Sequence, residues 1–209
     1  MHIKTVNSTS YFFGRANTMH HTPIAAGGSS FELINSARLF GEIHLKMGMR
    51  FLDVACGYGY YSIAVSQYVG ETGNVCAVDL WQDGIVHLSN HLKANSIHNI
   101  HSVLADARKM IPLKNSSVDL CLLATVLHDF MHEKTEEGVL KEIHRVLKAG
   151  GKFAIVEFKK IASKPGPPIE IRITPEQVNN VVIPYGFEFL KTVEIGQFHY
   201  LSLFEKMEA

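Results

Sequence analysis

The chain has few cysteines, no long apolar run and no excess of charge, and each absence narrows its class. Its three cysteines, Cys56, Cys76 and Cys121, are odd in number, far apart and never in a C-x-x-C pair, which favours a reducing compartment over a disulfide framework. We expect buried thiols, because each lies in an apolar segment. No apolar run approaches the roughly 20 residues of a bilayer span, and the first ten residues lack the apolar core of a secretory signal. A soluble, cytoplasmic protein with no membrane span is expected.

The charge balance argues against a nucleic acid partner. Twenty basic residues offset twenty acidic ones among 209, and no basic stretch carries interleaved aromatic residues. A hydrophobic content of 46% suffices for the core of one globular domain. The sequence holds no internal repeat and no low-complexity run.

From about residue 49 the chain alternates short β-branched runs with longer helical ones. This alternation predicts parallel strands joined by crossover helices. The predicted strands cover 49–55, 74–81, 99–106, 117–127 and 152–158. The predicted helices cover 60–70, 83–96 with Asp83 as a capping candidate, and 133–151 with a glycine stop.

The last third of the chain changes character. A helix is predicted over 174–186, with Thr174 as N-cap and Pro175 at the first helical position. Two strands, 187–195 and 198–206, follow with only Gly196-Gln197 expected between them, and must therefore be antiparallel.

The first 48 residues lack strand character. Residues 7–30 are loop-like, and 31–47 form a helical pattern. We therefore predict an N-terminal lid or arm over 1–48, followed by one α/β domain over 49–209.

A glycine turn, ACGYG, links the first strand to its helix. Such a turn brings backbone N–H groups and a helix N-terminus close to an anionic ligand. In a dinucleotide fingerprint starting at Gly57, the third glycine position is Ser62, so that motif is incomplete. Asp53, just before the turn, would repel a pyrophosphate but suit an ammonium group. A ligand with both a carboxylate and an amine fits better.

Two further acids stand at predicted strand ends. Asp79 follows the turn by about twenty residues, where a carboxylate can bind both ribose hydroxyls. Asp106 ends the third strand, where it could accept from an adenine amine while Ala107 offers a backbone N–H. Because ligands of open α/β sheets bind at the carboxyl ends of the strands, the three acids predict one site.

These residues carry a resemblance to a known family. Residues 49–205 resemble the class I S-adenosylmethionine-dependent methyltransferases in DVACGYG, AVDLW, ADA and KAGGKFAIVEF. ATVLHDF and GPPIEIRITPEQV resemble its branch around ubiquinone and menaquinone biosynthesis. The family implies an α/β three-layer sandwich with a Rossmann-like, seven-stranded, mostly parallel sheet of order 3-2-1-4-5-7-6, the seventh strand antiparallel. One departure is Ala55, where the family loop has its first glycine.

The resemblance assigns the S-adenosylmethionine contacts residue by residue. It places the methionine moiety at Asp53 and at the backbone of Ala55, Cys56, Gly57 and Gly59. It places the ribose at Asp79, the adenine at Leu80, Trp81, Asp106 and Ala107, and the sulfonium near Thr125. Trp81 is the only tryptophan, and its ring either covers the adenine or packs in the fold.

The acceptor side is expected after the fourth strand, in TVLHDFMHEK. His128 is a candidate general base at neutral pH, or a histidine that only shapes the loop. Asp129 would orient it or cap a helix. Candidate substrate contacts are Tyr58, His20, His21, Phe130 and His132. The GPP stretch 166–168 either shapes an acceptor pocket or breaks the chain.

The spacing of His128 and His132 matches metal-binding pairs on one face of a helix. No third ligand or outer acid can be assigned, so no metal is predicted.

The leading hypothesis is methyl transfer from S-adenosylmethionine to a small-molecule acceptor, by a monomer or homodimer. Two alternatives stay open: a non-catalytic protein that senses S-adenosylmethionine, and a nucleotide-dependent oxidoreductase. Ser62 and the final hairpin count against the oxidoreductase.

Overall fold

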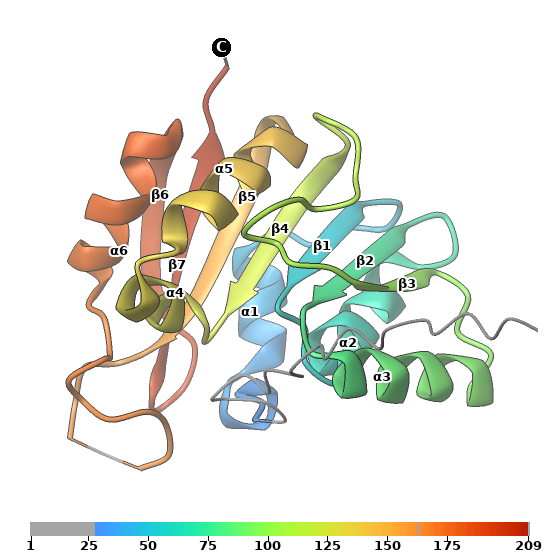
Figure 1. Cartoon of the computed structure of the whole chain (residues 1–209), viewed down its shortest axis with the longest axis horizontal. Helices are drawn as coiled ribbons and strands as arrows, with labels where there is room; N and C mark the ends of the chain where they lie inside the picture. Colours follow the sequence, from blue (N-terminus) through green and yellow to red (C-terminus); the bar gives the residue numbers. More distant parts are fainter. Residues whose placement is uncertain (1–27, 163, 209) are drawn as a thin grey trace, which may run out of the picture.

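The computed structural model describes residues 28–162 and 164–208 and shows a single mixed sheet between two layers of helices (Figure 1). The strands are β1 (Arg50–Val54), β2 (Asn74–Asp79), β3 (Ile100–Leu104), β4 (Val118–Ala124), β5 (Leu147–Phe158), β6 (Phe187–Glu194) and β7 (His199–Lys206). The helices are η1 (Phe31–Leu33), α1 (Ser36–Glu42), α2 (Tyr60–Val69), α3 (Gln82–Ala94), α4 (Leu127–Glu133), α5 (Glu136–Val146), α6 (Pro175–Val182) and η2 (Ile183–Tyr185).

The sheet has the order β3-β2-β1-β4-β5-β7-β6, which confirms the predicted fold. Strands β1 to β5 are parallel to one another, whereas β7 runs antiparallel to both β5 and β6. The strand order reverses between β1 and β4. Because crossover connections leave on opposite faces at such a point, a crevice opens there at the carboxyl ends of the strands.

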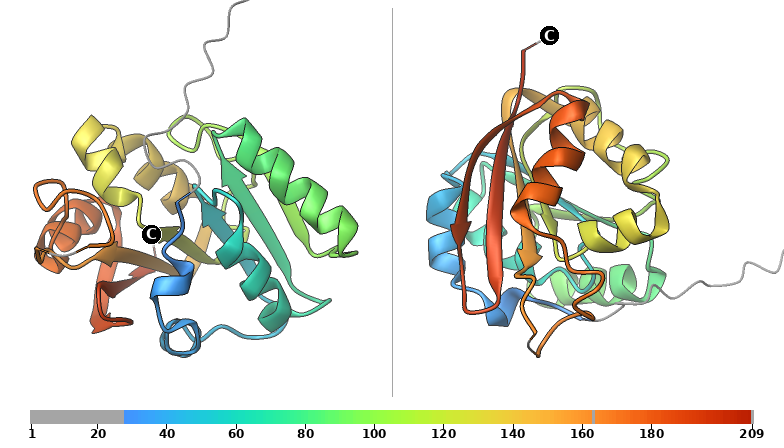
Figure 2. Two further views of the ribbon diagram at one scale, coloured as in Figure 1. Left: turned by 90° about the horizontal axis from the view of Figure 1, so that it is seen from below. Right: turned by 90° about the vertical axis from the view of Figure 1, so that its left-hand side faces the viewer.

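Each face of the sheet carries its own core. One core packs α1, α2 and α3 through residues such as Leu39, Val65 and Leu88. The other packs α5 and α6 through Val139 and Val178. Figure 2 shows α1 and α5 on opposite sides of the sheet. Strand β4 is buried along most of its length because it is covered on both faces, as its apolar sequence predicts.

The N-terminal segment joins the domain directly. Leu39, Phe40 and Ile43 are buried in the core beneath β1. The backbone N–H of Asn35 donates to the carbonyl of Ile195 over 2.6 Å, which ties the segment to the end of β6. The predicted helix over 31–47 is shorter in the structure, with a 3-10 turn and then α1. Residues 1–27 lie outside the described part of the chain.

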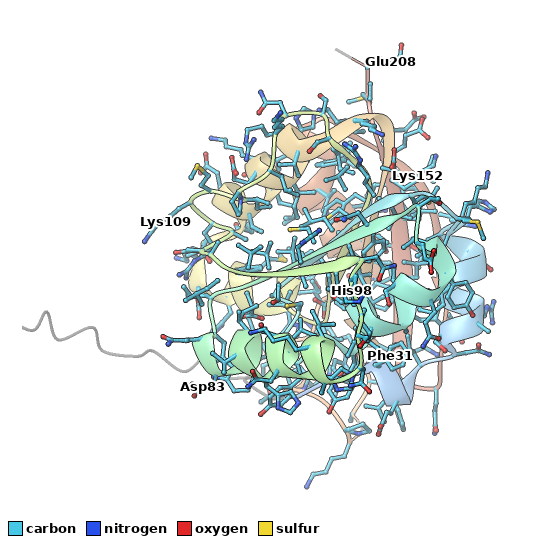
Figure 3. The ribbon with its side chains drawn as sticks, turned by 90° about the vertical axis from the view of Figure 1, so that its right-hand side faces the viewer. Phe31, Asp83, His98, Lys109, Lys152 and Glu208 are labelled. Atoms are coloured by element: carbon cyan, nitrogen blue, oxygen red, sulfur yellow. The ribbon has the colours of Figure 1, made fainter. Side chains whose placement is uncertain are left out.

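Several predicted boundaries differ from the structure. Helix α3 begins at Gln82, so Asp83 lies exposed in its first turn rather than at the cap (Figure 3). The helix predicted over 133–151 is shorter in the structure: α5 begins at Glu136, after the end of α4 at Glu133, and ends at Val146 without a glycine. The two glycines instead lie within β5, which begins at Leu147.

The fourth strand is shorter than its apolar run predicts. It ends at Ala124 because Thr125 takes a left-handed backbone conformation, with φ of 53°, which turns the chain out of the sheet. The predicted cap of α6 is confirmed: Thr174 accepts from Gln177 N–H, and the Gln177 side chain accepts from Thr174 N–H, which forms a capping box.

Candidate active site

A cavity of about 810 Å³ opens at the carboxyl ends of the central strands. It lies within the range of about 300–1,000 Å³ that small-molecule sites occupy. One side is lined by the glycine turn, by the end of β2 and by residues 105–108 after β3. The other side is lined by the segment after β4, by Phe158, by residues 165–168 and by Ile171. Residues 28–30 and Leu33 also contribute to the wall.

The glycine turn depends on backbone conformations with positive φ and on the space around its glycines. Ala55, Gly57 and Gly59 all have positive φ, of 57°, 55° and 78°. A side chain added at Gly57 would meet no atom within 4 Å, whereas one at Gly59 would lie 2.6 Å from Leu88. Gly57 therefore leaves space on the cavity side, and Gly59 allows α3 to approach.

Asp79 organises the same turn. One of its oxygens accepts from Gly57 N–H and the other from Trp81 N–H, each over 2.7 Å. Burial raises the pKa of Asp79, and these backbone hydrogen bonds partly offset that rise. Asp79 lines the cavity, so its carboxylate reaches both the turn and a ligand.

Asp53 lies behind the turn and does not line the cavity. Only 1% of its surface is exposed, and Ser62 Oγ donates to its Oδ2 over 2.6 Å. Burial raises the pKa of Asp53 to about 7, against the hydrogen bond from Ser62. Ser62 stands where the dinucleotide-binding fingerprint has its third glycine, and its hydroxyl thus holds the Asp53 carboxyl group in place.

Asp106 forms an ion pair with Arg108, a residue that the sequence did not single out. Arg108 donates to both its oxygens, over 2.8 and 3.0 Å, and this contact lowers the pKa of Asp106. Arg108 also lies 3.5 Å from Glu133. Lys109, which lies 3.5 Å from Asp106, extends to solvent in Figure 3. Asp106, Ala107 and Arg108 all line the cavity.

Trp81 forms a wall next to Leu80. Its ring packs edge-on against Tyr58 with centroids 4.8 Å apart, and Tyr58 packs in turn on His87. A side chain at Gly84 would lie 2.5 Å from the Trp81 ring, so that glycine permits the packing. Leu80 and Trp81 line the cavity, whereas Tyr58 supports Trp81 from outside it.

Thr125 connects the cavity to the N-terminal segment. Its Oγ1 lies 3.2 Å from Ser30 Oγ, which lies 2.8 Å from the hydroxyl of Tyr61. Ser30 and Thr125 line the cavity. Neither Ser30 nor Tyr61 carries a signal in the sequence that distinguishes it from other polar residues.

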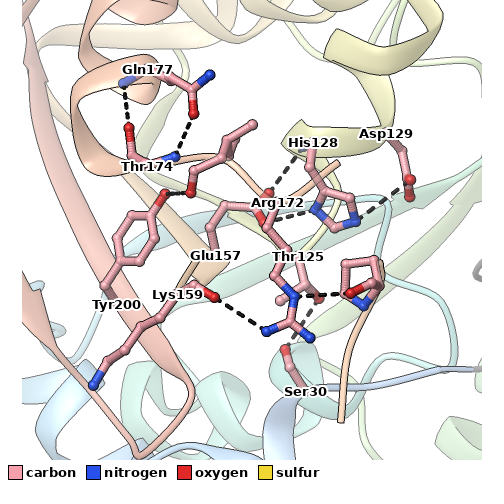
Figure 4. A network of polar contacts seen from close by, with 12 residues as sticks. Ser30, Thr125, His128, Asp129, Glu157, Lys159, Arg172, Thr174, Gln177 and Tyr200 are labelled. Carbon is pink, nitrogen blue, oxygen red and sulfur yellow. Dashed lines mark hydrogen bonds and ion pairs between the residues drawn. The ribbon is translucent and has the colours of Figure 1, made fainter. Parts of the chain in front are cut away.

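His128 is bound by a buried acid from the neighbouring strand (Figure 4). Glu157 Oε2 lies 2.7 Å from His128 Nδ1, and its Oε1 accepts from His128 N–H over 3.2 Å. On the other side of the ring, Nε2 lies 3.5 Å from Asp129 Oδ1. Burial alone would lower the pKa of His128, but Glu157 and Asp129 outweigh it and raise the pKa. His128, Asp129 and Phe130 line the cavity.

Sequence reasoning missed Glu157 and Arg172. Glu157 stands alone as an acid in the apolar strand KFAIVEF, and a charge in a buried strand is a signal that could have found it. Arg172 is 2% exposed and donates to the carbonyls of Lys159, Ile161, Pro165 and Pro167. It therefore holds the loop that forms one wall of the cavity.

Other predicted residues lie apart from the cavity. Cys56 and Gly59 belong to the glycine turn but do not line it, and His132 is exposed on α4. His20 and His21 lie outside the described residues. Within 28–162 and 164–208, no group of three or more His, Cys, Asp or Glu residues could hold a metal ion.

The cysteines in the described chain are free thiols. Burial raises the pKa of all three thiols, that of Cys76 to about 11.

No helix of the described residues is long and apolar enough to cross a membrane.

The residues at the turn fit S-adenosylmethionine. The space beside Gly57 can admit the methionine moiety, and the carboxylate of Asp79 at the end of β2 can accept from ribose hydroxyls. The cavity lining at Leu80, Trp81 and Ala107 offers an apolar surface for the adenine ring. The chemistry of these groups matches a zwitterionic nucleoside.

Comparison with known proteins gives the same result. A family model described as a methyltransferase domain matches residues 52–155. A solved S-adenosylmethionine-dependent methyltransferase from Aquifex aeolicus has 27% sequence identity and a TM-score of 0.79, over 86% of this chain and 93% of that one. The chain belongs to the class I S-adenosylmethionine-dependent methyltransferases.

Within that family it is similar to enzymes named demethylmenaquinone methyltransferase. The relative from Staphylococcus saprophyticus is 31% identical over 63% of this chain and 52% of its own length. The relative from Staphylococcus haemolyticus is 29% identical over 78% of this chain and 64% of its own length. The chain thus matches between about half and two thirds of the length of these relatives.

Proposed function

We propose that the protein transfers a methyl group from S-adenosylmethionine to a small-molecule acceptor. The observation that carries this proposal is a single cavity with two chemically different halves. One half presents Asp79 and the glycine turn, and the other presents His128. Donor and acceptor can therefore meet without leaving the protein, which is what an in-line transfer needs.

The donor half would hold S-adenosylmethionine through the residues that the family resemblance assigns. Asp79 would bind the ribose, and Leu80, Trp81, Asp106 and Ala107 the adenine. The backbone of Ala55 and Gly57 would face the methionine moiety, with Thr125 near the sulfonium. Asp53, Cys56 and Gly59 would act by supporting the turn, because none of them lines the cavity.

When bound, S-adenosylmethionine supplies an electrophilic methyl group on a positively charged sulfur. The chain aligns the acceptor and excludes water from this half of the cavity. Asp129 and Phe130 line the acceptor side beside His128, the candidate base.

The N-terminal segment would act as a lid. Residues 28–30 line the cavity and Ser30 meets Thr125 and Tyr61, so this segment stands over the expected sulfonium position. We retain the division into an N-terminal lid or arm over 1–48 and a methyltransferase domain over 49–209.

The acceptor class is supported by the apolar wall and by the relatives. The relatives named above are called demethylmenaquinone methyltransferases, and the wall formed by Phe158, Pro167 and Ile171 suits an apolar ring. A quinol-like acceptor is therefore the first to test. The cytoplasmic location and the monomer or homodimer state remain predictions.

Calorimetry with S-adenosylmethionine and an assay for adenosylhomocysteine over a panel of acceptors test the proposal together. We expect binding and turnover on at least one small acceptor. Binding without turnover on any acceptor would favour the sensor hypothesis. Binding of a nicotinamide cofactor in place of S-adenosylmethionine would favour the oxidoreductase.

A further inference from the structure

We propose that Arg108 is a positioning residue shared by the two halves of the cavity. In the donor half it presents Asp106 as a hydrogen-bond acceptor for the adenine amine, and on the acceptor side it holds the end of α4 through Glu133. This role rests on the proposed methyl transfer. It makes recognition of the donor base and placement of the acceptor wall depend on one guanidinium group.

Asp106, Arg108 and Glu133 form a continuous chain of ionic contacts, and all three residues line the cavity. Arg108 donates from Nε and Nη2 to the two oxygens of Asp106, over 2.8 and 3.0 Å. Its Nη1 lies 3.5 Å from Oε2 of Glu133. Asp106 follows β3 in the donor half, whereas Glu133 is the last residue of α4. The guanidinium therefore joins the two halves.

Arg108 leaves Asp106 with one site for a further hydrogen bond. Each oxygen of a carboxylate can accept about two hydrogen bonds. Oδ1 accepts from both the backbone N–H and the Nε–H of Arg108, so it is saturated. Oδ2 accepts from Nη2, and its second contact is Lys109 at 3.5 Å, whose side chain is 83% exposed. When Lys109 turns to solvent, Oδ2 can accept one N–H of an adenine amine.

The same contact determines the charge of Asp106. The hydrogen bonds from Arg108 lower the pKa of Asp106, which keeps its carboxylate ionised. An ionised carboxylate can only accept hydrogen bonds. A purine with an amine at position 6 can donate to it, whereas the 6-oxo group of hypoxanthine would bring a second acceptor to the same place. Arg108 thus makes Asp106 selective for an amino purine.

The backbone of Arg108 is fixed by its neighbours. A side chain at Gly138 of α5 would lie 2.2 Å from the carbonyl oxygen of Arg108, so this glycine lets α5 pack directly against it. On the other side, the N–H groups of Lys109 and Met110 donate to the carbonyl of Asp106 over 2.9 and 3.0 Å. The guanidinium therefore extends from a rigid turn.

Helix α4 has side-chain contacts at both ends. At its start, His128 is bonded to a buried acid of β5, and at its end, Glu133 contacts Arg108. Asp129 and Phe130 lie between these two points and line the cavity. The pair of Arg108 and Glu133 is partly exposed, so it adds little to global stability. Its loss should instead let the end of α4 move.

Calorimetry with two product analogues tests the donor half. The full-length protein is titrated with S-adenosylhomocysteine and with S-inosylhomocysteine, in which an oxygen replaces the adenine amine. We expect the wild type to prefer the adenosyl compound by at least about tenfold. Arg108→Met should weaken its binding and reduce the preference to about threefold or less, because Asp106 is no longer held. Lys109→Met removes the same charge one residue away, outside the cavity lining, and should match the wild type.

Amide hydrogen exchange over residues 127–135, without ligand, tests the contact to α4. Arg108→Met and Glu133→Gln should each speed exchange of this segment by at least about threefold. The double variant should exchange no faster than Arg108→Met, because both changes remove one contact. Glu137→Gln, exposed on α5, is the matched control. Arg108→Lys cannot bond both oxygens of Asp106 and reach Glu133 at once, so it should fall between wild type and Arg108→Met in both experiments, and it replaces Arg108→Met if that variant does not fold.

The outcomes separate this role from the proposed function. A wild type that binds neither compound would remove the proposed function and the adenine role with it. If the wild type binds S-adenosylhomocysteine but does not prefer it, or if Arg108→Met keeps the preference or binds more tightly, the role of Arg108 at Asp106 is overturned while methyl transfer stands. Unchanged exchange over residues 127–135 in Arg108→Met and Glu133→Gln would overturn the role at α4.

Discussion

Ser62 Oγ lies 2.6 Å from Oδ2 of Asp53, so the first turn of α2 is hydrogen-bonded to the end of β1 behind the cofactor loop. Both side chains are buried. This bond replaces the helix–strand contact that glycine gives in dinucleotide folds. It also places a titratable group in the core, and the first prediction follows from that.

Asp53 should make the protein less stable as the pH rises from about 4 to 7. Its folded pKa of about 7 exceeds the unfolded value of 3.8, so the folded state binds more protons in this window. Stability is therefore greatest below the unfolded pKa and falls, by on the order of 4 kcal/mol, up to the folded pKa. Asp53→Asn should remove this slope, as measured by thermal unfolding from pH 4 to 8. Exposed Asp83→Asn is the control, and equal slopes in all three proteins would contradict the prediction.

Asp79→Ala should weaken S-adenosylmethionine binding by about 1.5–3 kcal/mol, because charge-assisted hydrogen bonds to the ribose would be lost. The substitution also removes the hydrogen bonds that Asp79 accepts from the backbone N–H groups of Gly57 and Trp81, so the glycine turn should become less rigid. Asp79→Asn keeps the shape and should lose less. Calorimetry measures both affinities, with Asp83→Ala as the matched control. Unchanged affinity in Asp79→Ala would contradict the ribose role.

Ser30→Ala should release the N-terminal segment from the site. The change removes the contacts to Tyr61 and Thr125, each worth about 0.5–1.5 kcal/mol. We expect faster amide hydrogen exchange over residues 28–33 and lower turnover, with global stability changed little. Ser36→Ala, in the first turn of α1 and outside the cavity wall, is the control. Exchange that does not change over this segment would show that the bonds do not hold it.

Arg172→Met should disorder the wall of the acceptor half while sparing the donor half. The guanidinium binds four carbonyls between residues 159 and 167, and a methionine cannot replace them. We expect a rise in acceptor KM of about tenfold or more, with S-adenosylmethionine affinity within about twofold, because the acceptor wall is mispositioned. Limited proteolysis should cut the loop faster. Equal losses for donor and acceptor would contradict this division.

The sheet and the donor half of the cavity followed from local signals. Alternating strands and helices, a glycine turn and acids at strand ends depend on short segments, so Asp79 and Asp106 were identified as cavity residues before the fold was known. The last hairpin followed from its short connection alone. The residues of each such feature are close together in the sequence as well as in the structure, so a short stretch of sequence is enough to predict it.

The acceptor half followed only in part: His128, Asp129 and Phe130 were expected there and line the cavity, but the residues that hold them come from distant segments. Glu157 meets His128 across 29 residues, and Ser30 meets Thr125 across 95. No periodicity in the sequence marks such pairs. Boundaries failed for a related reason: the left-handed Thr125 ends β4 inside a run that is apolar enough to continue it.

The position of β7 sets the order in which the site can be completed. This last strand of the described chain lies between β5 and β6, so β6 cannot pair with the sheet until β7 has been synthesised. Pairs this far apart along the chain form late, because a long loop must close first. The donor half, built from β1 to β3, can form on the ribosome while β6 and β7 are still unmade. A nascent chain should therefore gain its nucleoside-binding half early, and the bond from Asn35 to Ile195 only after the segment with Ile195 has been synthesised.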